Sequence, residues 1–243
     1  MKNAEWYVDW FNSPYYHLLY KNRDRREANF FIDNLCRELQ LKQGAKIWDL
    51  ACGKGRHSIA LNQKGFDVTG TDLSNNSILA AKKSENELLH FEVHDMRTAY
   101  KENYFDAVFN LFTSIGYFPD ERDNEKVFRY VSKALKKNGE FVIDFFNAEK
   151  VLNSFKAEYH ELKEGIQFDI TKRIQNNAIL KRIEFSDQGH DYYFEEFVSL
   201  LKKEDFIKLG EQCGLTVHYC FGNYQLEPFD VEHSDRLIMI FKK

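Results

Sequence analysis

The residues best suited to chemistry lie in one short segment, where an acidic strand end precedes two closely spaced glycines. The segment reads Ile47-Trp48-Asp49-Leu50-Ala51-Cys52-Gly53-Lys54-Gly55, and Asp72 follows seventeen residues after Gly55. Because glycine has no Cβ, a ligand can approach the backbone of such a turn closely. A carboxylate at the end of the next strand can accept hydrogen bonds from two ribose hydroxyls. The spacing therefore predicts an adenosine-binding crevice at the carboxyl ends of parallel strands.

Two kinds of nucleotide site share this geometry. A dinucleotide site prefers Gly-x-Gly-x-x-Gly, in which the third glycine allows a helix to pack closely on a strand. Here Ser58 stands at the third position, and a dinucleotide site gives Asp49 no role. The pattern Asp-x-Ala-x-Gly-x-Gly instead closely resembles motif I of the class I S-adenosylmethionine-dependent methyltransferases.

Further segments resemble the same family. Asp72-Leu73-Ser74 is similar to its ribose-binding motif, and His94-Asp95-Met96 is similar to the loop that flanks the adenine. Residues 105–110 resemble its fourth strand, and residues 135–140 resemble its Leu-x-x-Gly-Gly turn, with Asn138 in place of the first glycine. The resemblance is strong over about residues 44–147 and looser over 14–43 and 200–243.

The resemblance implies the cofactor S-adenosyl-L-methionine and the product S-adenosyl-L-homocysteine. The residues implied for cofactor binding are Asp49, Ala51, Gly53, Gly55, Asp72, Leu73, Asp95, Met96 and Asn110. Small-molecule members often present an N-terminal Tyr and Arg to the cofactor, and the matching residues are Tyr16, Tyr20 and Arg23, with Arg25 and Arg26 as alternatives for the arginine. We expect Cys52 and His57 to be structural. No catalytic residue is assigned, and the histidines lack metal-ligand spacing, so we expect no metal.

The methyl acceptor is less constrained than the cofactor. The fourth strand ends in Asn110-Leu111-Phe112-Thr113, without the Asn-Pro-Pro-Tyr motif of amide or adenine amino methylation. We therefore expect in-line methyl transfer to an N or O atom of a small molecule. The alternatives are methylation of RNA or protein, and a non-catalytic protein that binds an adenosyl ligand. A macromolecular substrate calls for a basic face, for which Lys172, Arg173, Lys181 and Arg182 are the candidates.

Alternating strands and helices must position these residues. The apolar pattern predicts helices over 24–41, 56–64, 74–87, 121–137 and 202–213, and strands over 46–51, 67–72, 89–93, 105–112, 140–146, 215–221 and 236–241. Period-two alternation in three segments between 166 and 198 predicts an antiparallel meander. The order indicates an α/β fold: a Rossmann-like, doubly wound, seven-stranded sheet, mostly parallel with an antiparallel last strand, with helices on both faces and the meander as an insert.

We expect one domain with four parts. These are an N-terminal helical cap segment (1–43), a cofactor-binding core (44–150), an inserted β lid (155–200), and a C-terminal helix with closing strands (201–243). Aromatic residues make up 16% of the chain, and many fall in the N-terminal segment and the meander, where this fold would cover its active site.

Composition excludes several other classes. The 34 basic and 38 acidic residues give a formal net charge of −4, which argues mildly against a nucleic-acid partner. No apolar run reaches the roughly 18 residues that a membrane-spanning helix needs, and the N-terminus lacks the apolar core of a signal peptide. The four cysteines show no Cys-x-x-Cys spacing, which fits a reduced, cytoplasmic setting. The sequence does not indicate the oligomeric state.

Overall fold

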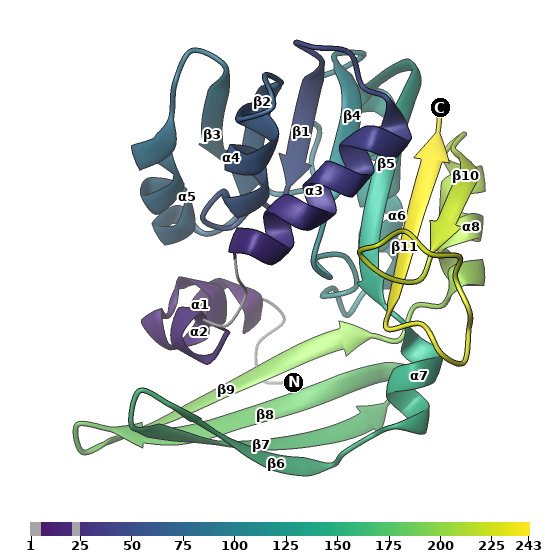
Figure 1. The fold of residues 1–243 in the computed structure, drawn as a ribbon. Coiled ribbons are helices and arrows are strands. Elements are labelled where there is room, and N and C mark those ends of the chain that lie inside the picture. The colour runs from purple at the N-terminus through teal and green to yellow at the C-terminus, as the bar shows by residue number, and fades with distance from the viewer. Residues whose placement is uncertain (1–5, 21–24) are drawn as a thin grey trace.

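A computed structural model describes residues 6–20 and 25–243, and its largest element is a seven-stranded mixed sheet (Figure 1). The strand order is β10-β11-β5-β4-β1-β2-β3. The strands are β1 (Lys46–Leu50), β2 (Asp67–Asp72), β3 (Leu89–Val93), β4 (Phe105–Asn110), β5 (Leu135–Phe146), β10 (Thr216–Phe221) and β11 (Arg236–Lys242). Strands β1 to β5 pair in parallel, whereas β11 runs antiparallel to both β5 and β10. The predicted fold class is confirmed.

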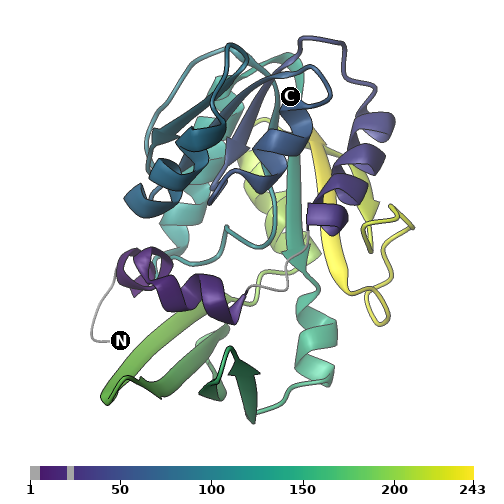
Figure 2. The ribbon, with the colours of Figure 1, turned by 60° about the vertical axis from the view of Figure 1, so that its left-hand side comes forward.

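Helices cover both faces of this sheet (Figures 1 and 2). One face carries α3 (Arg25–Leu39), α4 (Arg56–Asn62), α5 (Asn75–Ala81) and the 3-10 turn η1 (Lys82–Ser84); the other carries α6 (Glu121–Ala134) and α8 (Lys203–Gln212). Each face has its own apolar core. Phe31, Leu61 and Ile78 belong to the first core, and Phe128 and Phe206 belong to the second.

The insert is a separate antiparallel sheet of four strands, entered through helix α7 (Ala148–Asn153). Its strands are β6 (Glu158–Lys163), β7 (Ile166–Gln175), β8 (Ala178–Asp187) and β9 (His190–Ser199). The sequence predicts three of these strands and misses β6 and α7. Strand β6 is an edge strand whose half-buried positions are Tyr159, Glu161 and Lys163, so only one of them is apolar and the alternation cannot be seen.

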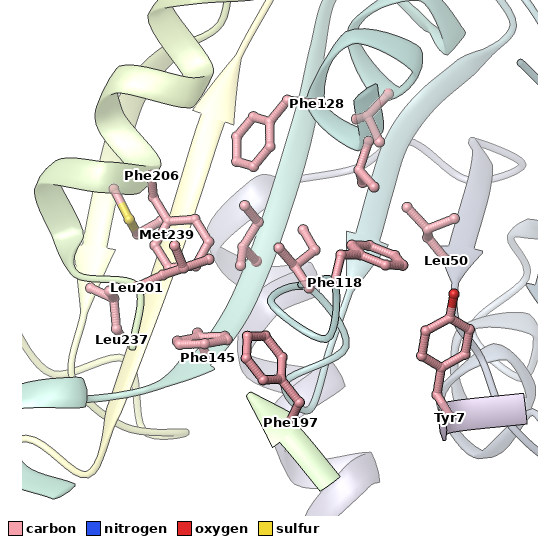
Figure 3. Close-up of a cluster of buried hydrophobic side chains, with 14 of the residues drawn as sticks. Tyr7, Leu50, Phe118, Phe128, Phe145, Phe197, Leu201, Phe206, Leu237 and Met239 are labelled. Atoms are coloured by element: carbon pink, nitrogen blue, oxygen red, sulfur yellow. The ribbon is translucent and has the colours of Figure 1, made fainter. Parts of the chain in front are cut away.

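Two short helices, α1 (Trp6–Asn12) and α2 (Pro14–Leu19), lie between the large sheet and the insert (Figures 1 and 2). We call this pair, together with Tyr20 at the C-terminal end of α2, the cap. Ser13 begins α2 by accepting a hydrogen bond from the Tyr15 N–H, and Pro14 occupies the first turn, where its missing N–H costs nothing. Figure 3 shows Tyr7 of α1, Phe197 of β9 and Phe145 of β5 in one buried cluster. The cap, the insert and the sheet therefore share one core.

Several predicted helices are longer than the observed ones. The helix predicted over 121–137 ends at Ala134, because Leu135 already begins β5. The helix predicted over 74–87 ends at Ala81, and only the short η1 follows it. None of the predicted cofactor-binding residues lies in these helix ends.

Candidate functional site

A cavity of about 400 Å³ lies between the carboxyl ends of β1, β2 and β4 and the cap. Residues from both sides line it, so the cap forms one wall and the strand ends form the other. Of the residues that the sequence predicts for the cofactor, those on its wall are Tyr16, Tyr20, Ala51, Gly53, Asp72, Leu73, Asp95 and Met96. The structure therefore brings most of the predicted set to one space.

The turn after β1 is built from left-handed backbone. Ala51, Gly53 and Gly55 have φ values of 63°, 56° and 78°. A Cβ on Gly53 would meet nothing within 4 Å, whereas a Cβ on Gly55 would lie 2.5 Å from the Phe91 ring. The two glycines therefore have different roles. Gly53 leaves the cavity wall without a side chain, and Gly55 lets α4 pack against the sheet.

This difference gives a prediction for the two glycines. Gly55→Ala is expected to lower the free energy of unfolding by about 2–4 kcal/mol, because it adds left-handed strain to a clash with a fully buried ring. Gly53→Ala carries the strain alone and is expected to cost about 1–2 kcal/mol. Urea denaturation of both variants measures the gap, and equal losses would contradict the assigned roles.

Asp72 holds the turn and also faces the cavity. Its Oδ2 accepts from the Gly53 N–H and its Oδ1 from the Ser74 N–H, each at 2.8 Å. Burial raises the pKa of Asp72, and the two hydrogen bonds, which lower it, offset this effect only in part. A carboxylate offers about four lone-pair directions, so both oxygens can accept a further bond from a ligand hydroxyl.

Asp49 lies behind the turn and does not line the cavity. It is 1% exposed, and its Oδ2 accepts a 2.5 Å hydrogen bond from the hydroxyl of Ser58, the residue that stands where a dinucleotide site has glycine. Burial raises the pKa of Asp49 from 3.8 to about 6. A carboxylate with a raised pKa stabilises the fold fully only below about pH 4, and its contribution declines as the pH rises through 6.

The charge of Asp49 is therefore expected to reduce stability at neutral pH. Asp49→Asn keeps an oxygen for Ser58 and is expected to raise the free energy of unfolding at pH 7 by up to about 3 kcal/mol. The advantage over wild type should grow between about pH 4 and 6 and then level off, because the shift defines that window. Denaturation at several pH values checks this; an advantage that does not change with pH would contradict it.

The structure leaves some predicted residues away from the cavity wall. Gly55 and Asn110 do not line it. Asn110 is fully buried and ties β4 to β1 through its Nδ2, which donates to the Leu50 carbonyl at 2.9 Å. Arg23 lies outside the described residues, as does the Arg25 side chain. Arg26 is exposed on α3.

The cavity also contains residues that the sequence did not assign to it. His57, expected to be structural, is buried yet lines the wall, where its Nε2 lies 3.3 Å from the Arg56 guanidinium. His17 on α2 and Lys54 in the glycine turn face the same space. Burial, helped by the charge of Lys54, lowers the pKa of His17 to about 4, so its imidazole is neutral at pH 7.

A strained loop after β4 forms the wall beyond the glycine turn. Phe112 and Thr113 both have left-handed φ values, of 71° and 61°. Buried Asp144 accepts from the Phe112 N–H at 2.9 Å and pairs with Arg236 at 2.7 Å. Arg236 also donates to the Thr113 hydroxyl at 3.1 Å. The Asp144–Arg236 pair therefore holds this wall in its unusual backbone conformation.

The four cations of the meander do not form one basic face. Lys181 is buried and Lys172 is half-buried, whereas the side chains of Arg173 and Arg182, one residue further along each strand, are exposed. Successive side chains of a strand point to opposite faces, so the set is divided between the two sides of the insert.

Neither a metal-binding cluster nor a membrane-spanning helix occurs within residues 6–20 and 25–243. In this range no group of three His, Cys, Asp or Glu side chains could hold a metal ion. No helix in it is long and apolar enough to cross a membrane.

Comparison with known proteins identifies relatives over most of the chain. A family model described as "Methyltransferase domain" matches residues 41–198. A glycine/sarcosine N-methyltransferase of Parasynechococcus marenigrum is 32% identical, with 98% of this chain and 84% of the relative covered. A putative methyltransferase of Bacillus subtilis is 28% identical, with 85% and 86% covered.

Solved structures show the same architecture. An S-adenosylmethionine-dependent methyltransferase from Clostridium acetobutylicum aligns with a TM-score of 0.79 at 21% identity, over 94% of this chain and 95% of its own. An amino pentose methyltransferase from Micromonospora echinaspora, solved with S-adenosylmethionine bound, aligns with a TM-score of 0.71 at 17% identity, over 95% and 97%. At these identities the likeness shows the fold alone.

Proposed function

Because the chain belongs to the class I S-adenosylmethionine-dependent methyltransferases, we propose that it transfers the methyl group to an amine nitrogen of a small molecule. The cofactor and the general reaction follow from the family. The nature of the acceptor is our proposal, and it is supported by the cavity and by relatives named for glycine and sarcosine N-methylation.

The residues on the cavity wall fit the cofactor. We place the ribose hydroxyls on the outward lone pairs of Asp72 and the adenine beside Leu73, Asp95 and Met96. The methionine part then passes over Gly53, where the space for a Cβ is open. Asp49 acts indirectly, because it holds Ser58 and with it the start of α4.

The observation that carries the proposal is the aromatic lining of the cavity. Phe11, Tyr16 and Tyr20 of the cap and Phe112 and Tyr117 of the loop after β4 all line one cavity. Phe11 lies 4.8 Å from Tyr16 and 5.4 Å from Tyr117 between ring centroids. Aromatic faces attract ammonium and methylammonium groups, so this lining suits an amine and its methylated product.

The bound cofactor supplies a methyl group that is already activated on a sulfonium. The protein's task is then to align the acceptor with that methyl group and to exclude water, an orientation effect worth up to about 7–11 kcal/mol in favourable cases. An ammonium acceptor must lose a proton before it can attack. His17 on the cavity wall is a neutral imidazole at pH 7, and we propose that it accepts a hydrogen bond from the amine. Its pKa of about 4 makes it too weak a base to hold the proton of the ammonium form, so that proton passes to solvent before the amine binds.

A screen with methyl-deuterated S-adenosylmethionine tests the proposal. Glycine and sarcosine are the amines to test, with glycolate as the hydroxyl counterpart of glycine, and total RNA and an unrelated unfolded protein as macromolecular acceptors. We expect label in a small amine and none in glycolate. Label in glycolate, RNA or protein would contradict the amine proposal and leave the family assignment unchanged.

A further inference from the structure

A buried polar network joins the cap to the insert; we call it the cap network, and it consists of Trp10, Tyr20, Lys181 and Glu196. The Trp10 indole N–H donates to Glu196 Oε1 at 2.6 Å, and the Tyr20 hydroxyl donates to the same atom at 2.7 Å. Lys181 Nζ donates to the Tyr20 hydroxyl at 2.5 Å and lies 3.4 Å from Glu196 Oε2. Three groups thus converge on one carboxylate.

The insert presents this carboxylate from its inner face. Lys172, Lys181 and Glu196 pair across β7, β8 and β9, so they form one row on the sheet. Lys181 is 8% exposed and Glu196 is 9% exposed. Burial and the charge of Lys181 lower the pKa of Lys172. Glu196 is therefore the anion of this row, with Glu161 also acting on Lys172, and it is the one that accepts hydrogen bonds from Trp10 and Tyr20.

Tyr20 connects the network to the cavity. The Tyr20 hydroxyl is hydrogen-bonded to Glu196 and Lys181, and Tyr20 also lines the cavity. Its ring lies 5.0 Å from the ring of Tyr16, and the Trp10 ring lies 5.6 Å from Tyr16, between centroids. Glu196 is thus linked through Tyr20 and Trp10 to Tyr16 on the cavity wall.

We propose that Glu196 is a positioning residue for methyl transfer, which acts through Tyr20 and Trp10 to hold the cap over the bound cofactor, with Lys181 as its counter-charge. The insert then controls the site from behind the cap without contacting the reacting atoms. The proposal rests on the family reaction and on the geometry of the cap. It does not depend on which acceptor the enzyme uses.

The chain offers a matched control for a merely structural contact. The Tyr15 hydroxyl also joins α2 to the insert, because it donates to Asp187 at 2.8 Å, but Tyr15 does not line the cavity. Tyr15→Phe and Tyr20→Phe each remove one hydroxyl from neighbouring parts of the cap. Only the second change breaks the cap network.

Two further variants separate the acceptor atoms of residue 196 from its charge. In a Lys181→Met background, Glu196→Gln keeps an oxygen for Trp10 and Tyr20, whereas Glu196→Leu removes it. Both double variants lack Lys181 and its counter-charge, and both keep Lys172, so the comparison of Gln with Leu is made at equal charge. Rescue by Gln but not by Leu is the signature of positioning through hydrogen bonds.

The test measures S-adenosylhomocysteine affinity by calorimetry and amide hydrogen exchange of residues 6–20, and neither readout needs an acceptor. We expect Tyr20→Phe and Lys181→Met/Glu196→Leu to weaken binding by about tenfold or more and to speed exchange. Tyr15→Phe and Lys181→Met/Glu196→Gln should stay within about threefold of wild type. Binding and exchange in Tyr20→Phe that match Tyr15→Phe would overturn the proposal, even if the Leu variant fails to fold.

Discussion

Arg236→Met is expected to lower the free energy of unfolding by about 3–5 kcal/mol, because it leaves the buried carboxylate of Asp144 without its counter-ion. Asp144 is fully buried, and the Arg236 side chain is 18% exposed. The remaining donors to Asp144, the Phe112 N–H and the Tyr224 hydroxyl at 3.2 Å, are neutral. They cannot replace the lost charge.

The same change should also release the wall of the cavity. Phe112 and Thr113 keep their left-handed backbone because Asp144 and Arg236 bind them. Arg236→Met/Asp144→Asn removes both charges but keeps an oxygen for the Phe112 N–H, so it should recover much of the stability. Arg122→Met, which breaks an exposed pair with Asp120, should have no measurable effect. An Arg236→Met variant as stable as Arg122→Met would contradict the assigned role.

Asp72→Ala is expected to weaken S-adenosylhomocysteine binding by at least about tenfold, because it removes two charge-assisted hydrogen bonds to the ribose. It also removes the acceptor of the Gly53 N–H and so loosens the turn that the cofactor crosses. Calorimetry on the folded variant measures the loss.

A second substitution at this position separates its two roles. Asp72→Asn keeps one acceptor for the backbone but loses the charge, and we expect an affinity between wild type and the alanine variant. Circular dichroism confirms that both variants are folded. Unchanged affinity in Asp72→Ala would remove Asp72 from the ribose site.

The sequence predicts the sheet well because β1, β4, β5 and β11 contain compact apolar runs. Ile47 to Leu50 and Phe105 to Asn110 are buried over nearly their whole length, so their pattern is strong. The glycine turn is visible for a different reason, since its backbone shape excludes most other residues. Local sequence therefore fixes both the strands and the turn between them.

The cap and its partners could not be predicted in this way. Glu196 and Tyr20 are separated by 176 residues and meet only because the insert folds back beneath the cap. Phe112 and Thr113 adopt left-handed φ values that neither residue type favours, so no local signal marks that wall. His17 gains its low pKa from burial and from Lys54, both of which depend on tertiary structure.

The predicted roles of Asp49 and Asn110 illustrate a further limit. Both belong to family motifs, yet both are buried behind the cavity wall and bind other parts of the protein. A motif identifies residues that a site needs, but it does not distinguish those that face the ligand from those that hold the wall.

A crystal structure of the protein with S-adenosylhomocysteine tests the central claim most directly. The account predicts the ribose on Asp72, the adenine beside Asp95 and Met96, and the sulfur directed at the space between Phe112 and Tyr117 of the loop and Tyr16 of the cap. A ligand bound elsewhere, or a sulfur directed away from the cap, would contradict it.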